Sequence, residues 1–109
     1  MSNGMWGWRR WSLSRWGLQY KMLERDVEKA LVRRVKALGG TCEKFTSPTK
    51  RSVPDRLVTM PGGKIIFVEL KAPGKTPTPL QERDHAARRA LGCDVRVIDT
   101  KEDADAFTP

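Results

Sequence analysis

Residues 64–70 constrain the fold more than any other part of the chain. Apolar side chains stand at Ile65, Ile66, Phe67, Val68 and Leu70, so they occupy both alternating sets of positions of an extended strand. Successive side chains of a strand point to opposite faces of a sheet, and a run of this kind is typical of a central strand covered on both faces. The sequence therefore predicts a sheet with helices packed on each side.

The flanking segments predict the other elements of an α/β (α+β) fold. Apolar residues at helical spacing before Gly39 and Gly40 indicate a first helix, and residues 61–63 have the composition of a hairpin turn. Thr78, with Pro79 and Gln81 behind it, is typical of a helix start. In chain order, we expect a helix at 23–38, strands at 41–45, 56–60 and 64–70, a helix at 79–92, a strand at 94–98 and a short helix at 101–107. This order, αβββαβ and a last short helix, predicts a mixed central sheet flanked by helices.

The composition changes after residue 21. All four tryptophans fall within the first 16 residues, and residues 1–21 contain no acidic side chain. An Arg/Trp arm that stacks on bases or lies on a membrane surface is one interpretation of this segment. We favour a poorly ordered extension from an upstream start codon, because Met22 opens a complete domain at 22–109 without it.

The charge balance favours a nucleic-acid partner over a small-molecule substrate. The chain has 21 Lys and Arg against 13 Asp and Glu, a formal charge of +8 and a pI near 10.0. Cys42 and Cys93 lie in no zinc-binding spacing, and a disulfide scaffold is not indicated. Neither a membrane span nor a signal peptide is evident, so we expect a cytoplasmic protein with no membrane partner.

Charged residues at the end of the central strand predict a chemical site. Glu69 and Lys71 should point to one face about 6.6 Å apart, and antiparallel pairing should bring Asp55 to the same end. Two carboxylates and the backbone carbonyl of Leu70 suit Mg²⁺ or Mn²⁺. Such an ion with a nearby lysine fits phosphodiester hydrolysis. The alternative is structural, with a Glu69–Lys71 salt bridge and Asp55 as a turn former.

Longer motifs resemble the VRR-NUC domain of the PD-(D/E)xK nuclease superfamily, stand-alone phage or bacterial type. The resemblance covers most of residues 22–98 and rests on Glu24, Gly39-Gly40, residues 53–74, Pro79-Leu80-Gln81 and Leu91-Gly92. It implies a restriction-endonuclease-like fold. It also implies site roles, with Asp55, Glu69, the Leu70 carbonyl and Glu24 binding the metal, Lys71 as catalytic lysine and Gln81 at the edge of the site.

Some assignments on the helices stay open at this point. Glu28 lies one turn from Glu24, and either carboxylate could face the metal or pair with Lys and Arg at helical spacing, although the alignment favours Glu24. Gln81 has a second role as capping partner of Thr78. His85, the single histidine, lies in a charged helix, and we expect it at the surface rather than as a general base.

Basic residues near the site are candidates for DNA contacts. We expect such contacts from Lys50, Arg51, Arg56 and Lys75.

The resemblance implies a metal-dependent endonuclease that acts as a homodimer on branched DNA, four-way Holliday junctions above all. The alternatives are a flap nuclease, a restriction-like enzyme of the same fold, or a DNA-binding module without catalysis. The intact Asp55, Glu69 and Lys71 argue against the last, because clustered carboxylates repel phosphate unless a metal intervenes.

Overall fold

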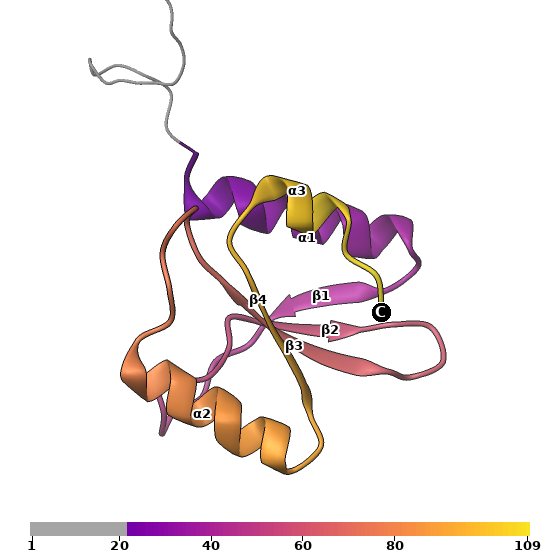
Figure 1. The fold of residues 1–109 in the computed structure, drawn as a ribbon. Helices are drawn as coiled ribbons and strands as arrows, with labels where there is room; N and C mark the ends of the chain where they lie inside the picture. Colours follow the sequence, from indigo (N-terminus) through magenta and orange to yellow (C-terminus); the bar gives the residue numbers. More distant parts are fainter. Residues whose placement is uncertain (1–21) are drawn as a thin grey trace, which may run out of the picture.

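A computed structural model of the protein describes residues 22–109, so the extension predicted at 1–21 lies outside the described residues. One mixed sheet is flanked by helices, as the sequence predicts (Figure 1). The elements in chain order are α1 (Glu24–Ala37), β1 (Thr41–Lys44), β2 (Arg56–Thr59), β3 (Ile65–Leu70), α2 (Pro79–Ala90), β4 (Asp94–Ile98) and α3 (Lys101–Asp105). No helix within residues 22–109 is long and apolar enough to cross a membrane.

The strands lie in the order β1-β2-β3-β4, which places β3 inside the sheet. β1 and β3 are both antiparallel to β2, whereas β4 runs parallel to β3. A parallel pair needs a long connection, and α2 supplies it. Figure 1 shows α1 and α3 on one face of the sheet and α2 on the other, so the predicted covering of both faces is confirmed.

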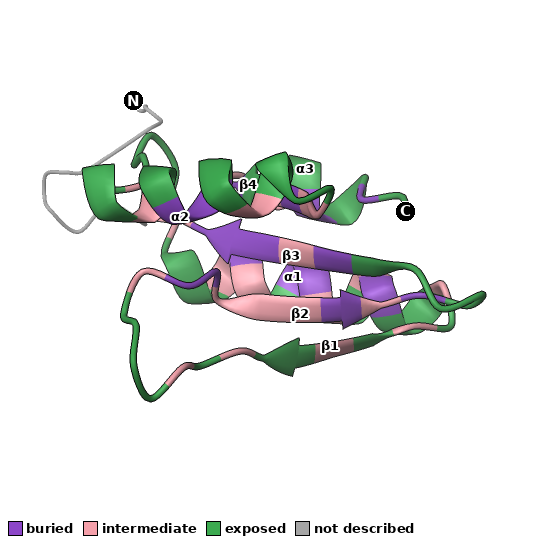
Figure 2. Cartoon of the chain, turned by 90° about the horizontal axis from the view of Figure 1, so that it is seen from below, coloured by how far each residue is buried: buried purple, intermediate pink, exposed green. Residues whose placement is uncertain are grey.

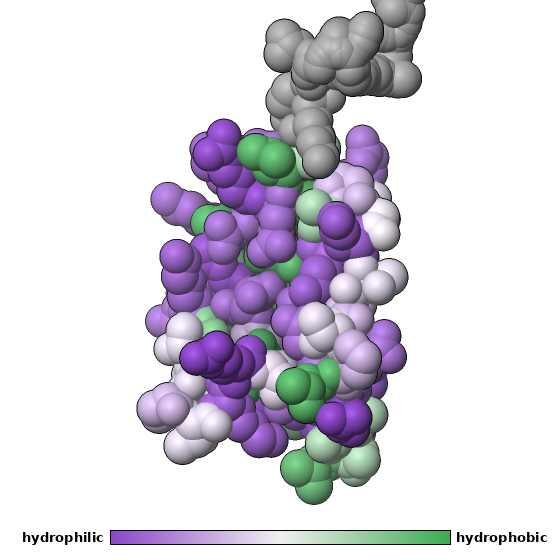
Figure 3. All heavy atoms as spheres, turned by 90° about the vertical axis from the view of Figure 1, so that its left-hand side faces the viewer, coloured by the Kyte–Doolittle hydropathy of each residue, from purple (hydrophilic) through white to green (hydrophobic). Residues whose placement is uncertain are grey.

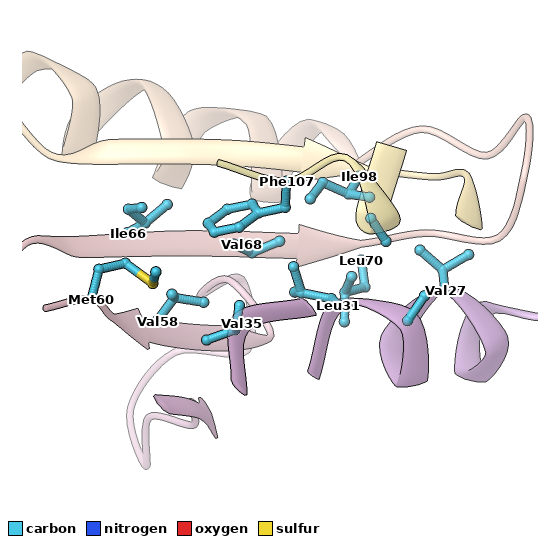
Figure 4. Packing of buried hydrophobic residues seen from close by; sticks show 12 residues of the cluster. Val27, Leu31, Val35, Val58, Met60, Ile66, Val68, Leu70, Ile98 and Phe107 are labelled. Atoms are coloured by element: carbon cyan, nitrogen blue, oxygen red, sulfur yellow. The ribbon is translucent and has the colours of Figure 1, made fainter. Parts of the chain in front are cut away.

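The hydrophobic core lies between the sheet and the pair α1 and α3. Leu31 and Val35 of α1 are fully buried against Ile66 and Val68 of β3 (Figure 4). Burial of one such side chain contributes about 1.5–3 kcal/mol. The same cluster contains Val27, Ala30, Val58, Met60, Leu70, Ile98, Ala104 and Phe107.

The opposite face of the sheet is packed with more polar groups. The guanidinium of Arg88 on α2 lies 4.9 Å from the ring centre of Phe67 and 5.4 Å from that of Phe45. Ile65 at the start of β3 remains 42% exposed, and Figure 2 shows the rest of β3 more deeply buried. Helix α2 therefore covers this face of the sheet largely without an apolar stripe of its own.

The end of α1 depends on close backbone approach. Gly39 has φ 87°, and the N–H of Gly40 donates to the carbonyl of Val35 at 3.0 Å. A Cβ atom at Gly40 would lie 2.7 Å from the carbonyl oxygen of Thr59. Glycine at position 40 thus lets the turn into β1 lie directly against β2.

Candidate active site

The predicted site residues come from elements that meet at one end of the sheet, where β2 begins and β3 ends. Asp55 directly precedes β2, Glu69 lies near the end of β3, Glu24 begins α1 and Gln81 lies in the first turn of α2. Figure 1 shows these element ends on one side of the molecule, and Figure 3 shows that this side is largely hydrophilic.

Asp55 is fixed between two strands. Its Oδ2 accepts a hydrogen bond from the backbone N–H of Leu70 at 2.9 Å, just beyond the last residue pair of the β2–β3 ladder, Arg56 with Val68. Its backbone carbonyl accepts one from the N–H of Phe45 at 2.8 Å. Antiparallel pairing thus brings Asp55 to the end of β3, as the sequence predicts.

The side chains of Glu69, in β3, and Lys71, directly after β3, lie next to each other. The Nζ of Lys71 lies 3.1 Å from Glu69 Oε2 and donates to Gln81 Oε1 at 2.9 Å. The Glu69 side chain is 1% exposed. Burial first, and then the negative charge of Asp55, raise the pKa of Glu69 to about 7, although Lys71 acts in the opposite direction.

Gln81 combines both of the roles that the sequence left open. Its Oε1 accepts from the N–H of Thr78 at 2.9 Å, and its own N–H donates to Thr78 Oγ1 at 3.2 Å, which completes the capping box of α2. The same Oε1 accepts from Lys71. The cap of α2 therefore also holds the lysine.

Of the two carboxylates on α1, the neighbouring charges and the contacts favour Glu24 over Glu28 at the site. Burial and the neighbouring charge of Asp55 raise the pKa of Glu24, and Lys71 lowers it, so Glu24 lies within the field of both groups. Glu28 instead accepts from Arg56, with Oε2 at 2.7 Å from Nη2.

The structure contradicts the surface position expected for His85. This side chain is 2% exposed, and its Nε2 lies 3.8 Å from Glu69 Oε1. Burial, followed by the charge of Arg89, lowers its pKa. The apolar pattern of α2 gives no sign of this burial, but the four-residue spacing from Gln81 places His85 on the same face of the helix.

The candidate DNA contacts divide into a first group of exposed side chains and a second group, of one, that is largely buried. Lys50, Arg51 and Lys75 are exposed, and Lys50 lies 3.6 Å from Asp84.

Arg56 belongs to the second group. Side chains alternate along β2, so Arg56 points to the same side of the sheet as Val58, the side covered by α1. Its side chain is 12% exposed. Its guanidinium donates to Glu28 and to the carbonyl of Cys42. The prediction that Arg56 contacts DNA is not supported by this geometry, because three of its five N–H donors are already used within the fold and its side chain is largely buried.

The carboxylate and carbonyl oxygen atoms at this site suit a hard divalent cation. Glu69 Oε1 is buried and has no hydrogen-bond partner, which is unfavourable for a carboxylate unless a cation or donor completes its surroundings. Within residues 22–109, no group of three or more His, Cys, Asp or Glu side chains is arranged to hold a metal ion by itself. Mg²⁺ is commonly held by one or two carboxylates with water and substrate oxygens. Asp55, Glu69 and the Leu70 carbonyl are the groups that could hold it.

Comparison with known proteins agrees with this description. No protein-family model matches the chain. The chain is 56% identical over 79 residues to "Putative nuclease p44" of Acyrthosiphon pisum secondary endosymbiont phage 1, a match that spans 72% of this chain and 85% of the phage protein. A solved structure described as a VRR_NUC domain is 36% identical, with a TM-score of 0.72, and the match covers 76% of this chain and 90% of that one.

Fold and site together define a small mixed-sheet domain in which carboxylates and a lysine meet at one sheet edge. The chain belongs to the VRR-NUC family, as its motifs predict.

Proposed function

We propose that this VRR-NUC nuclease hydrolyses phosphodiester bonds of DNA with Mg²⁺ or Mn²⁺ held by Asp55, Glu69 and the Leu70 carbonyl. Glu24 is proposed to contribute from the first turn of α1, because the charges of Asp55 and Lys71 act on its carboxyl group and Glu28 is paired with Arg56 instead. The observation that carries the proposal is the buried Glu69 carboxylate, which lies beside Lys71 and has an oxygen without a partner. A purely structural salt bridge leaves no reason to bury that oxygen unpaired.

Each side chain has a distinct role in the proposed reaction. A bound divalent cation lowers the pKa of a coordinated water and neutralises charge on the scissile phosphate. Asp55 is oriented for binding by the Leu70 N–H, and Glu69 presents its carboxylate from the end of β3. Lys71 is held by Gln81 and Glu69, so its ammonium is positioned to orient the nucleophile and to stabilise negative charge in the transition state.

The DNA is proposed to approach the hydrophilic side of the molecule shown in Figure 3. The exposed side chains of Lys50, Arg51 and Lys75 are proposed to neutralise backbone phosphates there. Such contacts carry little sequence information, which suits an enzyme that selects a DNA structure rather than a base sequence.

Branched DNA, with the four-way Holliday junction as principal substrate, is the proposed specificity, and a homodimer is the proposed active form. Residues 22–109 form a domain that can contact only a few base pairs at once. A symmetric pair of copies would bring two sites to two strands of one junction. Flap cleavage by a monomer is the alternative with the same chemistry, and a DNA-binding module without catalysis is the alternative without it.

Cleavage of labelled four-way, flap and linear DNA tests this proposal. The purified protein is assayed with Mg²⁺, with Mn²⁺ and with EDTA, and its mass in solution is measured by light scattering. We expect paired metal-dependent cuts near the branch point of the four-way substrate. Preferential flap cutting by a monomer would leave the chemistry intact and reject the proposed specificity.

Two variants separate catalysis from folding. Asp55→Asn and Lys71→Ala should lose cleavage while retaining the circular dichroism spectrum and binding to four-way DNA. The matched control is Glu43→Gln, which neutralises an exposed carboxylate on β1 and should cut like the unaltered protein. Cutting at the unaltered rate by Asp55→Asn would refute the assigned site, and tight binding without cleavage under any metal would support the binding module.

A further inference from the structure

Two buried polar atoms that face each other are left without hydrogen-bond partners. Within residues 22–109, Glu69 Oε1 and His85 Nε2 are the buried side-chain nitrogen and oxygen atoms in this condition. They lie 3.8 Å apart, and the two side chains are 1% and 2% exposed. Buried polar groups in folded proteins are nearly always paired, so this pair requires an explanation.

Helix α2 places one residue against Lys71 and another against Glu69. Gln81, in the first turn, accepts from Lys71. His85, one turn later on the same helix face, lies against Glu69. The neighbouring Asp84 is instead paired with Arg88 and Lys50.

The chemistry of the two groups determines how they would pair. A carboxylate oxygen can only accept, and a neutral imidazole carries one N–H donor. An N–H···O hydrogen bond has a length of about 2.9 Å, so a movement of about 1 Å by either side chain closes the gap. Active-site hydrogen bonds are often long before metal and substrate are bound.

We propose that His85 is a positioning residue for Glu69: its Nε2–H donates to one lone pair of Oε1 and fixes the carboxylate, Oε2 faces Lys71, and the second lone pair of Oε1 remains for the metal. This inference rests on the proposed function, because the benefit of fixing Glu69 lies in its role as a metal ligand. Residues that hold a metal ligand by a hydrogen bond typically change metal affinity about 10–100-fold when they are replaced.

Three substitutions at position 85 distinguish a donor from a space-filling side chain. His85→Gln places an amide N–H near the position of Nε2, whereas the amide of His85→Asn is too short to reach it. His85→Leu removes the polar group altogether. Mn²⁺ binding to the DNA-free protein is measured by titration calorimetry, and cleavage of four-way DNA is measured over a range of Mn²⁺ concentrations.

We expect His85→Asn and His85→Leu to weaken Mn²⁺ binding about 10–100-fold. His85→Gln should restore most of the affinity, and all three should cut more normally at high Mn²⁺. Unchanged affinity in both His85→Asn and His85→Leu would overturn the inference, and so would equal weakening by Gln and Asn. If His85→Leu does not fold, the Gln and Asn pair decides the outcome, because both keep a polar side chain.

The unaltered protein and Asp55→Asn separate this inference from the proposed function. Failure of the unaltered protein to bind Mn²⁺, or equal binding by Asp55→Asn, would refute the metal site itself. Binding that depends on Asp55 but not on His85 would refute the positioning role alone.

Discussion

The substitution Glu69→Gln measures the energetic cost of the buried carboxylate. Burial and Asp55 raise the pKa of Glu69 from 4.5 to about 7. A carboxyl group with a raised pKa stabilises the fold below its unfolded pKa, and that stabilisation is lost as the pH rises through the folded pKa. A rise of about 2.5 in pKa corresponds to about 3 kcal/mol, at about 1.4 kcal/mol for each pH unit.

The assay is urea unfolding of the unaltered protein and Glu69→Gln at pH 5 and pH 8 in EDTA, followed by circular dichroism. Between these two pH values, the stability of the variant relative to the unaltered protein should increase by about 2–3 kcal/mol. His85 is present in both proteins and acts in the opposite direction, because its pKa is lowered and its contribution to stability therefore increases with pH.

Identical pH dependence of the two proteins would refute this reasoning, because the buried charge would then carry no cost. Glu43→Gln, the exposed control on β1, should follow the unaltered protein. Adding Mn²⁺ at pH 8 should stabilise the unaltered protein by an amount that increases with the logarithm of its affinity for the ion, but should leave Glu69→Gln unchanged. The variant should therefore be more stable than the unaltered protein without metal and inactive with it.

Three further substitutions test the packing around the site by urea unfolding. Arg56→Ala should cost about 1–3 kcal/mol, because it leaves the partly buried Glu28 without its partner, and an exposed position for Arg56 would give a loss near zero. Gly40→Ala should destabilise the fold by more than about 1 kcal/mol, since the new Cβ would meet the Thr59 carbonyl at 2.7 Å; a neutral result would show that the turn can relax. Thr78→Ala removes the side-chain cap of α2 and should cost about 1 kcal/mol, whereas Thr78→Ser should retain most of the stability.

The parts of the fold with regular apolar patterns could be predicted from the sequence. The spacing from Val27 to Val35 defined α1, and the run at 65–70 defined the central strand. The convergence of Asp55 with Glu69 followed from antiparallel geometry alone. These predictions succeeded because burial of apolar side chains dictates where each of these elements packs.

The polar packing could not be predicted in the same way. Helix α2 buries Asp84 and His85 and lays Arg88 over an aromatic ring, so its inner face carries no apolar stripe to detect. Arg56, expected to contact DNA, lies on the α1 side of its strand and is paired with Glu28. The partners that make these positions favourable come from distant parts of the chain and appear only once the sheet has formed.

The hydrogen bond from the Leu70 N–H to Asp55 makes the proposed site depend on the correct register of β2 and β3. A hairpin paired one residue out of register would move Glu69 and Lys71 to the opposite face of the sheet. Asp55 would then lose its place at the end of β3, and the carboxylates would no longer meet. Under the proposed function, a chain that has not completed folding would therefore leave DNA uncut, because the register that closes the sheet also brings the proposed site residues together.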